Sequence, residues 1–300
     1  MSDKVRVFVG TDRSQLLAVK VLEHSIKRYT QLDVEVTPML DLPVKQPKDP
    51  QNYKRTGFSF SRFCIPKLAG YTGKAIYMDA DMLVFKDISS LWNIPFDGAK
   101  VIIQEEIPLE YQKTNKLGAP SQRIKQCAVM LLDCSHLSWD IDSIIDDLDK
   151  GKYNYEKLMY ELCILDDETE IKYGVPFQWN SLEHYDTTTC LIHYTDMGTQ
   201  PWVFSGNKYG YLWFDEVRMM LEDGSLTWQE LNQEIDLGYF RPSLMRDLKY
   251  GNWLPEILKP AFYKANNLLD KQRRYQPHKE AYRLKKIREE AMKRINHNSN

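Results

Sequence analysis

The sequence predicts an α/β fold: a mostly parallel central sheet flanked by helices, followed by a helical C-terminal extension. The chain opens with a Val-rich strand at 5–9, a turn at Gly10-Thr11-Asp12, a helix over 14–29 and a second strand at 34–36. Short apolar runs typical of buried strands follow at 75–78, 101–103, 128–132 and 191–194, with a helix expected over 155–165. Strands that alternate with helices in this way form a mostly parallel sheet.

Helical periodicity defines the other elements. In the first helix Val19, Leu22, Ile26 and Tyr29 recur at three- and four-residue steps, which predicts one buried stripe. Another helix is expected over 59–68, after a loop at 41–52 that contains three prolines. Beyond residue 206 the pattern is helical, with segments expected at 212–221, 227–235, 255–269 and 278–295.

Length and charge divide the chain into three parts. Three hundred residues suffice for one large or two modest domains. We expect an α/β domain over 1–205, a helical extension over 206–253 packed on it, and a basic helical tail over 254–300. The tail holds twelve Lys or Arg and five Asp or Glu, whereas the whole chain has a formal net charge of −2. An amphipathic basic helix of this kind is able to lie on an anionic membrane surface or to pair with a partner helix, and both interpretations stay open.

Composition argues against several classes of protein. The five cysteines are scattered, with no C-x-x-C pair, which disfavours a disulfide framework or a zinc site and fits a reducing cytosol. No signal-peptide pattern precedes the first strand, and no apolar run approaches the roughly 18 residues of a membrane span. We therefore expect a cytoplasmic protein whose membrane contact, if any, is peripheral at the inner face. We expect no nucleic-acid partner.

Two carboxylates follow the strand at 75–78. Because alternate residues of a strand point to the same side, Asp79 and Asp81 are expected to aim at one point. Ligands bind at the carboxyl ends of strands in open α/β sheets. Two hard oxygen ligands there suit a divalent ion that is also held by substrate phosphates. Taken alone, however, Asp-x-Asp is also common in solvated turns and helix caps.

A second group of polar residues lies at 191–202. His193 closes a short apolar strand, where a histidine is more often a hydrogen-bonded core residue than a metal ligand. An imidazole beside two carboxylates would shift the preference from Mg²⁺ towards Mn²⁺. Gly198 and Pro201 indicate a shaped loop whose backbone N–H groups are able to approach phosphate oxygens.

The order of these motifs resembles glycosyltransferase family 8, the glycogenin and bacterial lipopolysaccharide galactosyltransferase group, which has the GT-A nucleotide-diphospho-sugar transferase fold. The resemblance covers about residues 4–205. The motifs that carry it are the opening strand and turn, Phe60-Ser-Arg62-Phe, Tyr77-Met-Asp79-Ala-Asp81, the strand Cys127–Asp133, Pro176-Phe-Gln-Trp179-Asn180, and the block His193…Gly198…Pro201-Trp202.

The resemblance implies a retaining hexosyltransferase that uses a UDP-sugar, Mn²⁺ (or Mg²⁺) and a glycan, lipid or protein acceptor. It implies that Asp79, Asp81 and His193 hold the metal. The residues that it places at the nucleotide-sugar site are Gly10, Thr11, Asp12, Arg62, Ala80, Cys127, Gly198 and Gln200. The catalytic candidates are Arg62, Asp79, Asp81 and Glu156.

The sequence departs from the family pattern in three places. Gln126-Cys127-Ala128 stands where Asn-Ala-Gly or Asn-Ser-Gly is usual, so the side chain of Ala128 is expected to alter the donor-sugar pocket. Gln200 replaces the usual lysine, which removes a charge-assisted contact to the diphosphate typically worth about 1.5–3 kcal/mol. At the usual Asp-Gln-Asp helix start this chain has either Glu156 or Lys157.

Two other functions are compatible with parts of the pattern. A non-catalytic UDP-sugar-binding or scaffold protein that kept the fold is the main alternative, because Ala128 and Gln200 alter the surroundings of the metal motif. A phosphatase of the haloacid-dehalogenase type also places Asp-x-Asp at a strand end. There the pair lies close to the N-terminus and is followed by Thr or Val, whereas here Met82 follows it.

Overall fold

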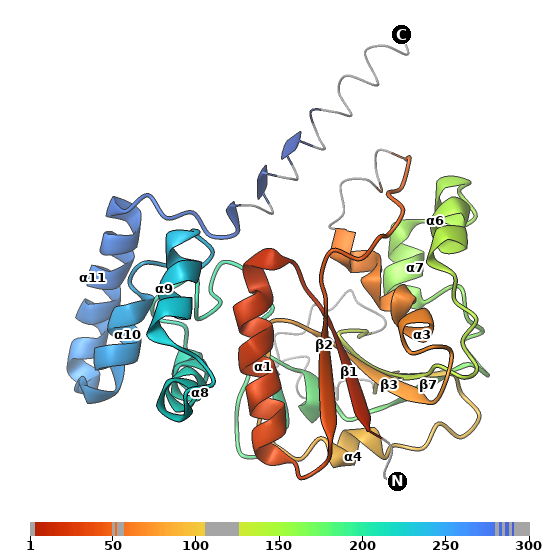
Figure 1. Cartoon of the computed structure of the whole chain (residues 1–300), viewed down its shortest axis with the longest axis horizontal. Helices are drawn as coiled ribbons and strands as arrows, with labels where there is room; N and C mark the ends of the chain where they lie inside the picture. The colour runs from red at the N-terminus through yellow and green to blue at the C-terminus, as the bar shows by residue number, and fades with distance from the viewer. Residues whose placement is uncertain are drawn as a thin grey trace.

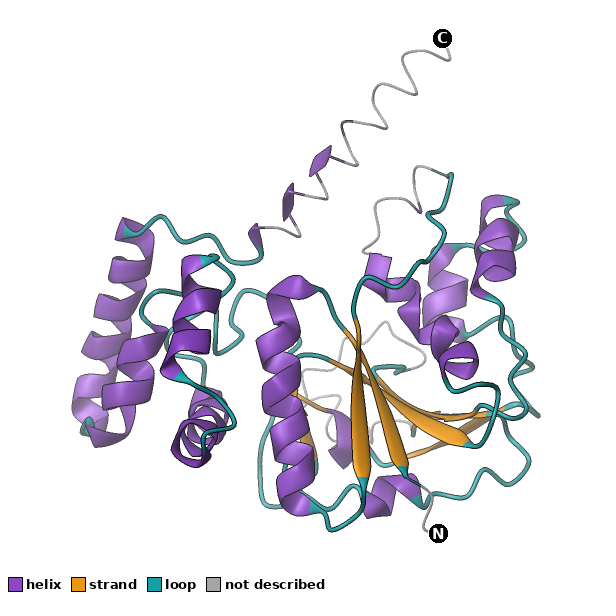
Figure 2. Ribbon diagram, viewed as in Figure 1, coloured by secondary structure: helices purple, strands orange, loops and turns teal. Residues whose placement is uncertain are grey.

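The protein is described by a computed structural model that covers residues 4–49, 52, 57–105 and 126–279, and positions 282, 283, 286, 287 and 290. Strands form the centre of the α/β part, and a group of helices lies beside it (Figures 1 and 2). The tail helix expected over 278–295 lies mostly outside the described residues. None of the helices in the described part of the chain is long and apolar enough to span a membrane.

The central sheet has six strands in the order β2-β1-β3-β6-β5-β7. Strand β1 pairs in parallel with β2 and β3, and β5 pairs in parallel with β7. Strand β6 runs antiparallel to both of its neighbours. Three of the five pairings in this sheet are parallel, which confirms the prediction of a mostly parallel sheet. The bounds are Val5–Gly10 (β1), Val34–Met39 (β2), Lys74–Asp79 (β3), Val101–Gln104 (β5), Val129–Asp133 (β6) and Ile171–Val175 (β7).

A second sheet of three short strands has the order β4-β9-β8. These strands are Met82–Val84 (β4), Ser181–Leu182 (β8) and Leu191–His193 (β9). Because β3 ends at Asp79 and β4 begins at Met82, the chain passes from the large sheet to the small one within the Asp-x-Asp motif. The motif is therefore a junction between two sheets.

The first helix is buried on two faces. Helix α1 (Leu16–Tyr29) follows a 3-10 turn (η1, Arg13–Gln15). Val19, Leu22 and Ile26 pack on the large sheet, as the periodicity predicted. A second face, formed by Leu17, Ala18 and Val21, packs against the helical extension. The prediction of a single buried stripe was therefore wrong, because α1 lies between the sheet and the extension (Figure 1).

Short helices cover the other side of the sheet. The segment expected to be one helix over 59–68 is a 3-10 helix (η2, Gly57–Cys64) followed by α3 (Ile65–Leu68), with Pro66 in its first turn. The helix expected over 155–165 ends earlier, at Glu161, because Leu162 adopts a left-handed conformation with φ 50°. Helices α6 (Ile141–Asp149) and α7 (Tyr155–Glu161) lie on this side too, whereas α4 (Ser89–Trp92) and η3 (Phe177–Asn180) pack into the core on the side of α1.

The extension consists of helices, as predicted. Helix α8 is capped by Gly224, whose φ of 80° suits this position, and α9 begins with a capping box between Thr227 and Glu230. Helix α11 belongs to the same packed group, since Asn266 Nδ2 donates to Asp247 Oδ2 at 2.9 Å. The division of the chain at 205 and 253 stays a prediction. The bounds are Gly210–Asp223 (α8), Trp228–Asp236 (α9), Leu244–Tyr250 (α10), Gly251–Trp253 (η4), Glu256–Leu258 (η5) and Lys259–Gln272 (α11).

Candidate functional site

A cleft of about 220 Å³ lies at the carboxyl ends of β1 and β3. The parallel register pairs Gly10 with Asp79, so the last residues of the two strands lie side by side. Six of the residues predicted for the site line this cleft, namely Gly10, Arg62, Asp79, Ala80, Asp81 and Cys127. Its other described lining residues are Gln15, Ser59, Ala128, Tyr155, Met159, Tyr160 and Met197.

Asp79, Asp81 and His193 converge at the edge of the cleft. One ligand atom from each residue lies within 4.8 Å of the other two. The Nε2 atom of His193 is 3.0 Å from Asp81 Oδ1 and 3.8 Å from Asp79 Oδ2. Two carboxylates and an imidazole form a donor set that suits a divalent ion such as Mn²⁺.

The small sheet brings His193 to the motif across more than a hundred residues of sequence. Strands β4 and β9 pair in antiparallel register, with Met82 opposite His193. The Tyr194 N–H donates to the backbone carbonyl of Asp81 at 2.8 Å, which continues the pairing to the motif itself. Backbone hydrogen bonds therefore fix the imidazole beside the carboxylates.

A buried amide fixes the tautomer of His193. Asn180 Nδ2 donates to Gln104 Oε1 at 2.7 Å, which leaves Asn180 Oδ1 as the acceptor for the Nδ1–H of His193 at 2.9 Å. The Nε2 atom therefore faces the carboxylates, as in a metal-binding histidine supported by an outer-shell partner. Burial lowers the pKa of His193, but the charges of Asp81 and Asp79 outweigh it and hold the pKa above its ordinary value. The same negative field favours a bound cation.

Arg62 lies beside this cluster and is held from two sides. Its Nη1 donates to the carbonyl of Cys127 and its Nη2 to the hydroxyl of Tyr77, both at 3.0 Å, and the guanidinium lies 4.5 Å from the centre of the Tyr77 ring. Burial lowers the pKa of Arg62, but Tyr77 and Asp79 outweigh it, so the net shift is upward and the group stays charged. Tyr77 in turn donates to Asp79 Oδ1 at 2.6 Å.

Several buried polar atoms around the cleft have no hydrogen-bond partner among the described residues. They are Arg62 Nε, Gln104 Nε2 and Gln200 Oε1. Such atoms are costly to bury unless a ligand, an ion or water satisfies them. The donor set and the unpartnered Arg62 Nε beside it fit a divalent ion together with an anionic, oxygen-rich ligand.

Besides His193, which lies at its edge, five of the predicted site residues do not line the cleft. Asp12 accepts hydrogen bonds from the backbone N–H and hydroxyl of Ser14 and so caps the 3-10 turn, and the hydroxyl of the buried Thr11 donates to the Asp12 carbonyl. Gly198 is exposed, and its N–H donates to Asp196 Oδ1. Gln200 is fully buried. Glu156 lines a separate cavity, to whose wall Tyr155 also contributes.

Tyr77, Gln104 and Asn180 support the cluster but were not among the predicted site residues. Tyr77 lies two residues before Asp79 on the same strand, so strand alternation alone already placed it on the face of the first carboxylate. Asn180 belongs to one of the motifs that carry the family resemblance, and the structure shows that it contacts His193. No sequence signal distinguishes Gln104 from any other polar residue at the end of a strand.

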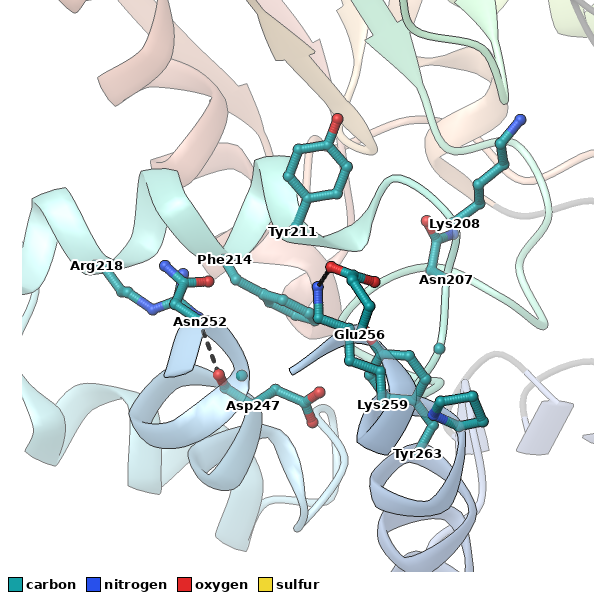
Figure 3. Close-up of a pocket in the computed structure, with 13 residues that line it drawn as sticks. Asn207, Lys208, Tyr211, Phe214, Arg218, Asp247, Asn252, Glu256, Lys259 and Tyr263 are labelled. Atoms are coloured by element: carbon teal, nitrogen blue, oxygen red, sulfur yellow. Dashed lines mark hydrogen bonds and ion pairs between the residues drawn. The ribbon is translucent and has the colours of Figure 1, made fainter. Parts of the chain in front are cut away.

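A larger pocket of about 510 Å³ lies in the helical extension (Figure 3), and none of the predicted site residues lines it. Most of its polar groups are bonded to other protein atoms. Lys259 pairs with Glu256, and Arg218 donates to Asp215 and to the carbonyls of Leu248 and Asp247. We therefore assign the candidate site to the cleft that holds Asp79.

Comparison with known proteins agrees with the family resemblance of the sequence motifs. Residues 6–129 match the family model for glycosyl transferase family 8. The resemblance to this family is confirmed. A curated relative, Protein CDI of Arabidopsis thaliana, is 29% identical over 231 residues, which cover 71% of this chain and 85% of that protein.

Solved structures of glycosyltransferases share the fold. The glycosyltransferase GlyE of Streptococcus pneumoniae aligns with a TM-score of 0.52 and 15% identity over 80% of this chain and 65% of its own. The galactosyltransferase LgtC, solved with donor and acceptor sugar analogues, aligns with a TM-score of 0.51 and 13% identity over 77% of this chain and 100% of its own. The apo bifunctional glycosyltransferase WbbM has a TM-score of 0.50 and 14% identity over 72% of this chain.

This chain thus spans half of the WbbM chain and somewhat less than two thirds of GlyE. The fold is the GT-A fold, as the motif order implied. Together with the family match, this fold supports a glycosyltransferase.

Proposed function

We propose that the protein is a retaining glycosyltransferase that moves a hexose from a UDP-sugar to a glycan, lipid or protein acceptor. The observation that carries this proposal is the convergence of Asp79, Asp81 and His193 within 4.8 Å at the edge of the cleft. These three residues would hold a divalent ion, Mn²⁺ or Mg²⁺. When bound, such an ion supplies a Lewis acid that neutralises charge on the leaving diphosphate.

The chain's own groups prepare the cleft for an anionic donor. The contacts to Tyr77 and Cys127 fix the guanidinium of Arg62, and its buried Nε, which has no partner among the described residues, is a donor that a phosphate or sugar oxygen would satisfy. Ala128, which lines the cleft, adds a methyl group where glycine is usual and so limits the donor sugar. Retention by front-face attack and by a transient covalent intermediate both stay open. Glu156 stays a catalytic candidate by resemblance only, because it faces a different cavity.

Substitution of one metal ligand tests the proposal. We expect the unaltered chain to hydrolyse or transfer from at least one UDP-sugar in the presence of Mn²⁺. Asp81→Asn should lower that rate by about 100-fold or more, because Lewis-acid stabilisation is worth several kcal/mol and about 1.4 kcal/mol is a factor of ten. Asp97→Asn is the matched control, since Asp97 has a φ of 52°, which Asn also tolerates, and forms an exposed pair with Lys172. Unchanged activity of Asp81→Asn would refute the site.

A binding protein without turnover is the second candidate, and the buried Gln200 in place of a cation favours it. A thermal-shift screen of UDP-glucose, UDP-galactose and their N-acetyl forms, with and without Mn²⁺, identifies the donor in either case. A ligand at a hundredfold excess over its Kd adds about 2.7 kcal/mol to the stability of the state that binds it. Metal-dependent binding with no hydrolysis would favour the binding protein. Cytoplasmic location and peripheral membrane contact through the tail stay predictions.

A further inference from the structure

The side chain of Gln200 is hydrogen-bonded to a proposed metal ligand. It is fully buried, and its Nε2 donates to Asp81 Oδ2 at 2.9 Å and to the carbonyl of Tyr194 at 3.0 Å. The Tyr194 N–H donates in turn to the carbonyl of Asp81. The amide of Gln200 therefore joins the Asp81 carboxylate to the backbone that carries His193.

This contact fixes the rotation of the Asp81 carboxylate. With Oδ2 engaged by the amide, Oδ1 faces the Nε2 atom of His193 at 3.0 Å. An amide donates without adding charge, so both carboxylates of the cluster keep their full attraction for a cation. A lysine ammonium in the same place would neutralise Asp81 and oppose a bound divalent ion.

The helical extension holds the backbone next to Gln200. Arg241 Nε donates to the carbonyl of Pro201 at 3.1 Å, and the Arg241 N–H donates to the carbonyl of Trp202 at 2.9 Å. Arg241 is fully buried and pairs with Asp247 at 2.7 Å. The buried Arg241–Asp247 ion pair of the extension therefore holds the loop that carries Gln200. This ion pair lies outside the cleft.

We infer that Gln200 is a positioning residue for the metal site, acting through Asp81, and that the extension fixes its place. The inference rests on the proposed metal site and deepens it. It replaces the expectation that Gln200 touches the nucleotide-sugar: the residue does not line the cleft, and its amide protons are used inside the protein. The chain therefore orients its metal ligand with a neutral group where the family pattern has a cation.

Titration of the full chain with Mn²⁺ alone, followed by the electron paramagnetic resonance of the free ion, tests this role. We expect Gln200→Met to weaken Mn²⁺ binding by about 10- to 100-fold, the usual effect of losing an outer-shell partner. Gln200→Lys, which carries the residue usual in the family, should weaken it at least as much. Affinity for UDP without metal should not change in Gln200→Met, because Gln200 does not line the cleft.

Asn252→Leu is the matched control. It removes an amide that donates to a carboxylate oxygen of Asp215 at 3.1 Å, outside the Arg241–Asp247 pair that holds the loop of Gln200. Mn²⁺ binding by Gln200→Met equal to that of the unaltered chain, or an equal loss in Asn252→Leu, would overturn the inference. If Gln200→Met fails to fold by circular dichroism, Gln200→Lys carries the same test. An unaltered chain that does not bind Mn²⁺ would overturn the metal site itself, and the role of Gln200 with it.

Discussion

Gly10→Ala tests whether the close packing of Gly10 against Tyr77 maintains the metal site. A Cβ at this position would lie 2.6 Å from the hydroxyl oxygen of Tyr77, closer than Cβ atoms approach other atoms in proteins, and 3.2 and 3.3 Å from two ring carbons. The hydroxyl has no room to yield, because Tyr77 is fully buried and is bonded to both Asp79 and Arg62. The substitution therefore forces the phenol away from its two partners.

The cost follows from the contacts. Overpacking of a core costs typically about 1–3 kcal/mol. Each lost hydrogen bond adds about 0.5–1.5 kcal/mol. We therefore expect Gly10→Ala to lower the free energy of unfolding by about 2–6 kcal/mol, measured by urea denaturation. Mn²⁺ binding should also weaken, because Asp79 loses the hydroxyl that orients it.

A double-mutant cycle isolates the clash. Tyr77→Phe removes the oxygen at 2.6 Å and leaves only the two ring contacts, so Gly10→Ala should cost about 1 kcal/mol or less in that background. Gly198→Ala is the control, because its Cβ would meet a single exposed carboxylate oxygen at 3.3 Å. Equal costs of Gly10→Ala with and without the Tyr77 hydroxyl would refute the reasoning.

Two further predictions concern His193 and helix α9. Asn180→Leu leaves the buried Nδ1–H of His193 without an acceptor, so Mn²⁺ affinity measured by calorimetry should fall about 10- to 100-fold. Thr227→Ala should cost about 0.5–2 kcal/mol of unfolding free energy, through loss of its cap, and leave Mn²⁺ affinity unchanged. Hydrogen bonds from Lys20 and then Thr227 lower the pKa of Glu230 from 4.5 to about 2, so its stabilisation is present above pH 4.5 and is lost as the pH falls towards 2. As the pH falls through that range, the free energy of unfolding of Thr227→Ala should accordingly decrease less steeply than that of the unaltered chain. An unchanged slope would contradict this assignment.

Local chemistry explains which parts of the fold the sequence predicted. Strand β1, the following turn and helix α1 depend on neighbouring residues and on period, so their positions were correct. The end of α7 was wrong because the apolar pattern continues past Glu161, whereas the left-handed conformation of Leu162 stops the helix. The second buried face of α1 was missed because only the packing of the extension distinguishes it from an exposed face.

Sequence alone determined that Asp79 and Asp81 stand at a strand end and that His193 closes another strand. The tertiary structure decided that they meet, through the antiparallel register that sets Met82 opposite His193. It also decided that the amides of Gln200 and Asn180 support those ligands. The physical reason is that the residue type of a ligand and its position on a strand depend only on neighbouring residues in the sequence. The orientation of Asp81 depends on a hydrogen bond from Gln200, 119 positions away, and that of His193 on Asn180, which is itself bonded to Gln104, 76 positions away. These contacts exist only when both sheets and the extension are assembled.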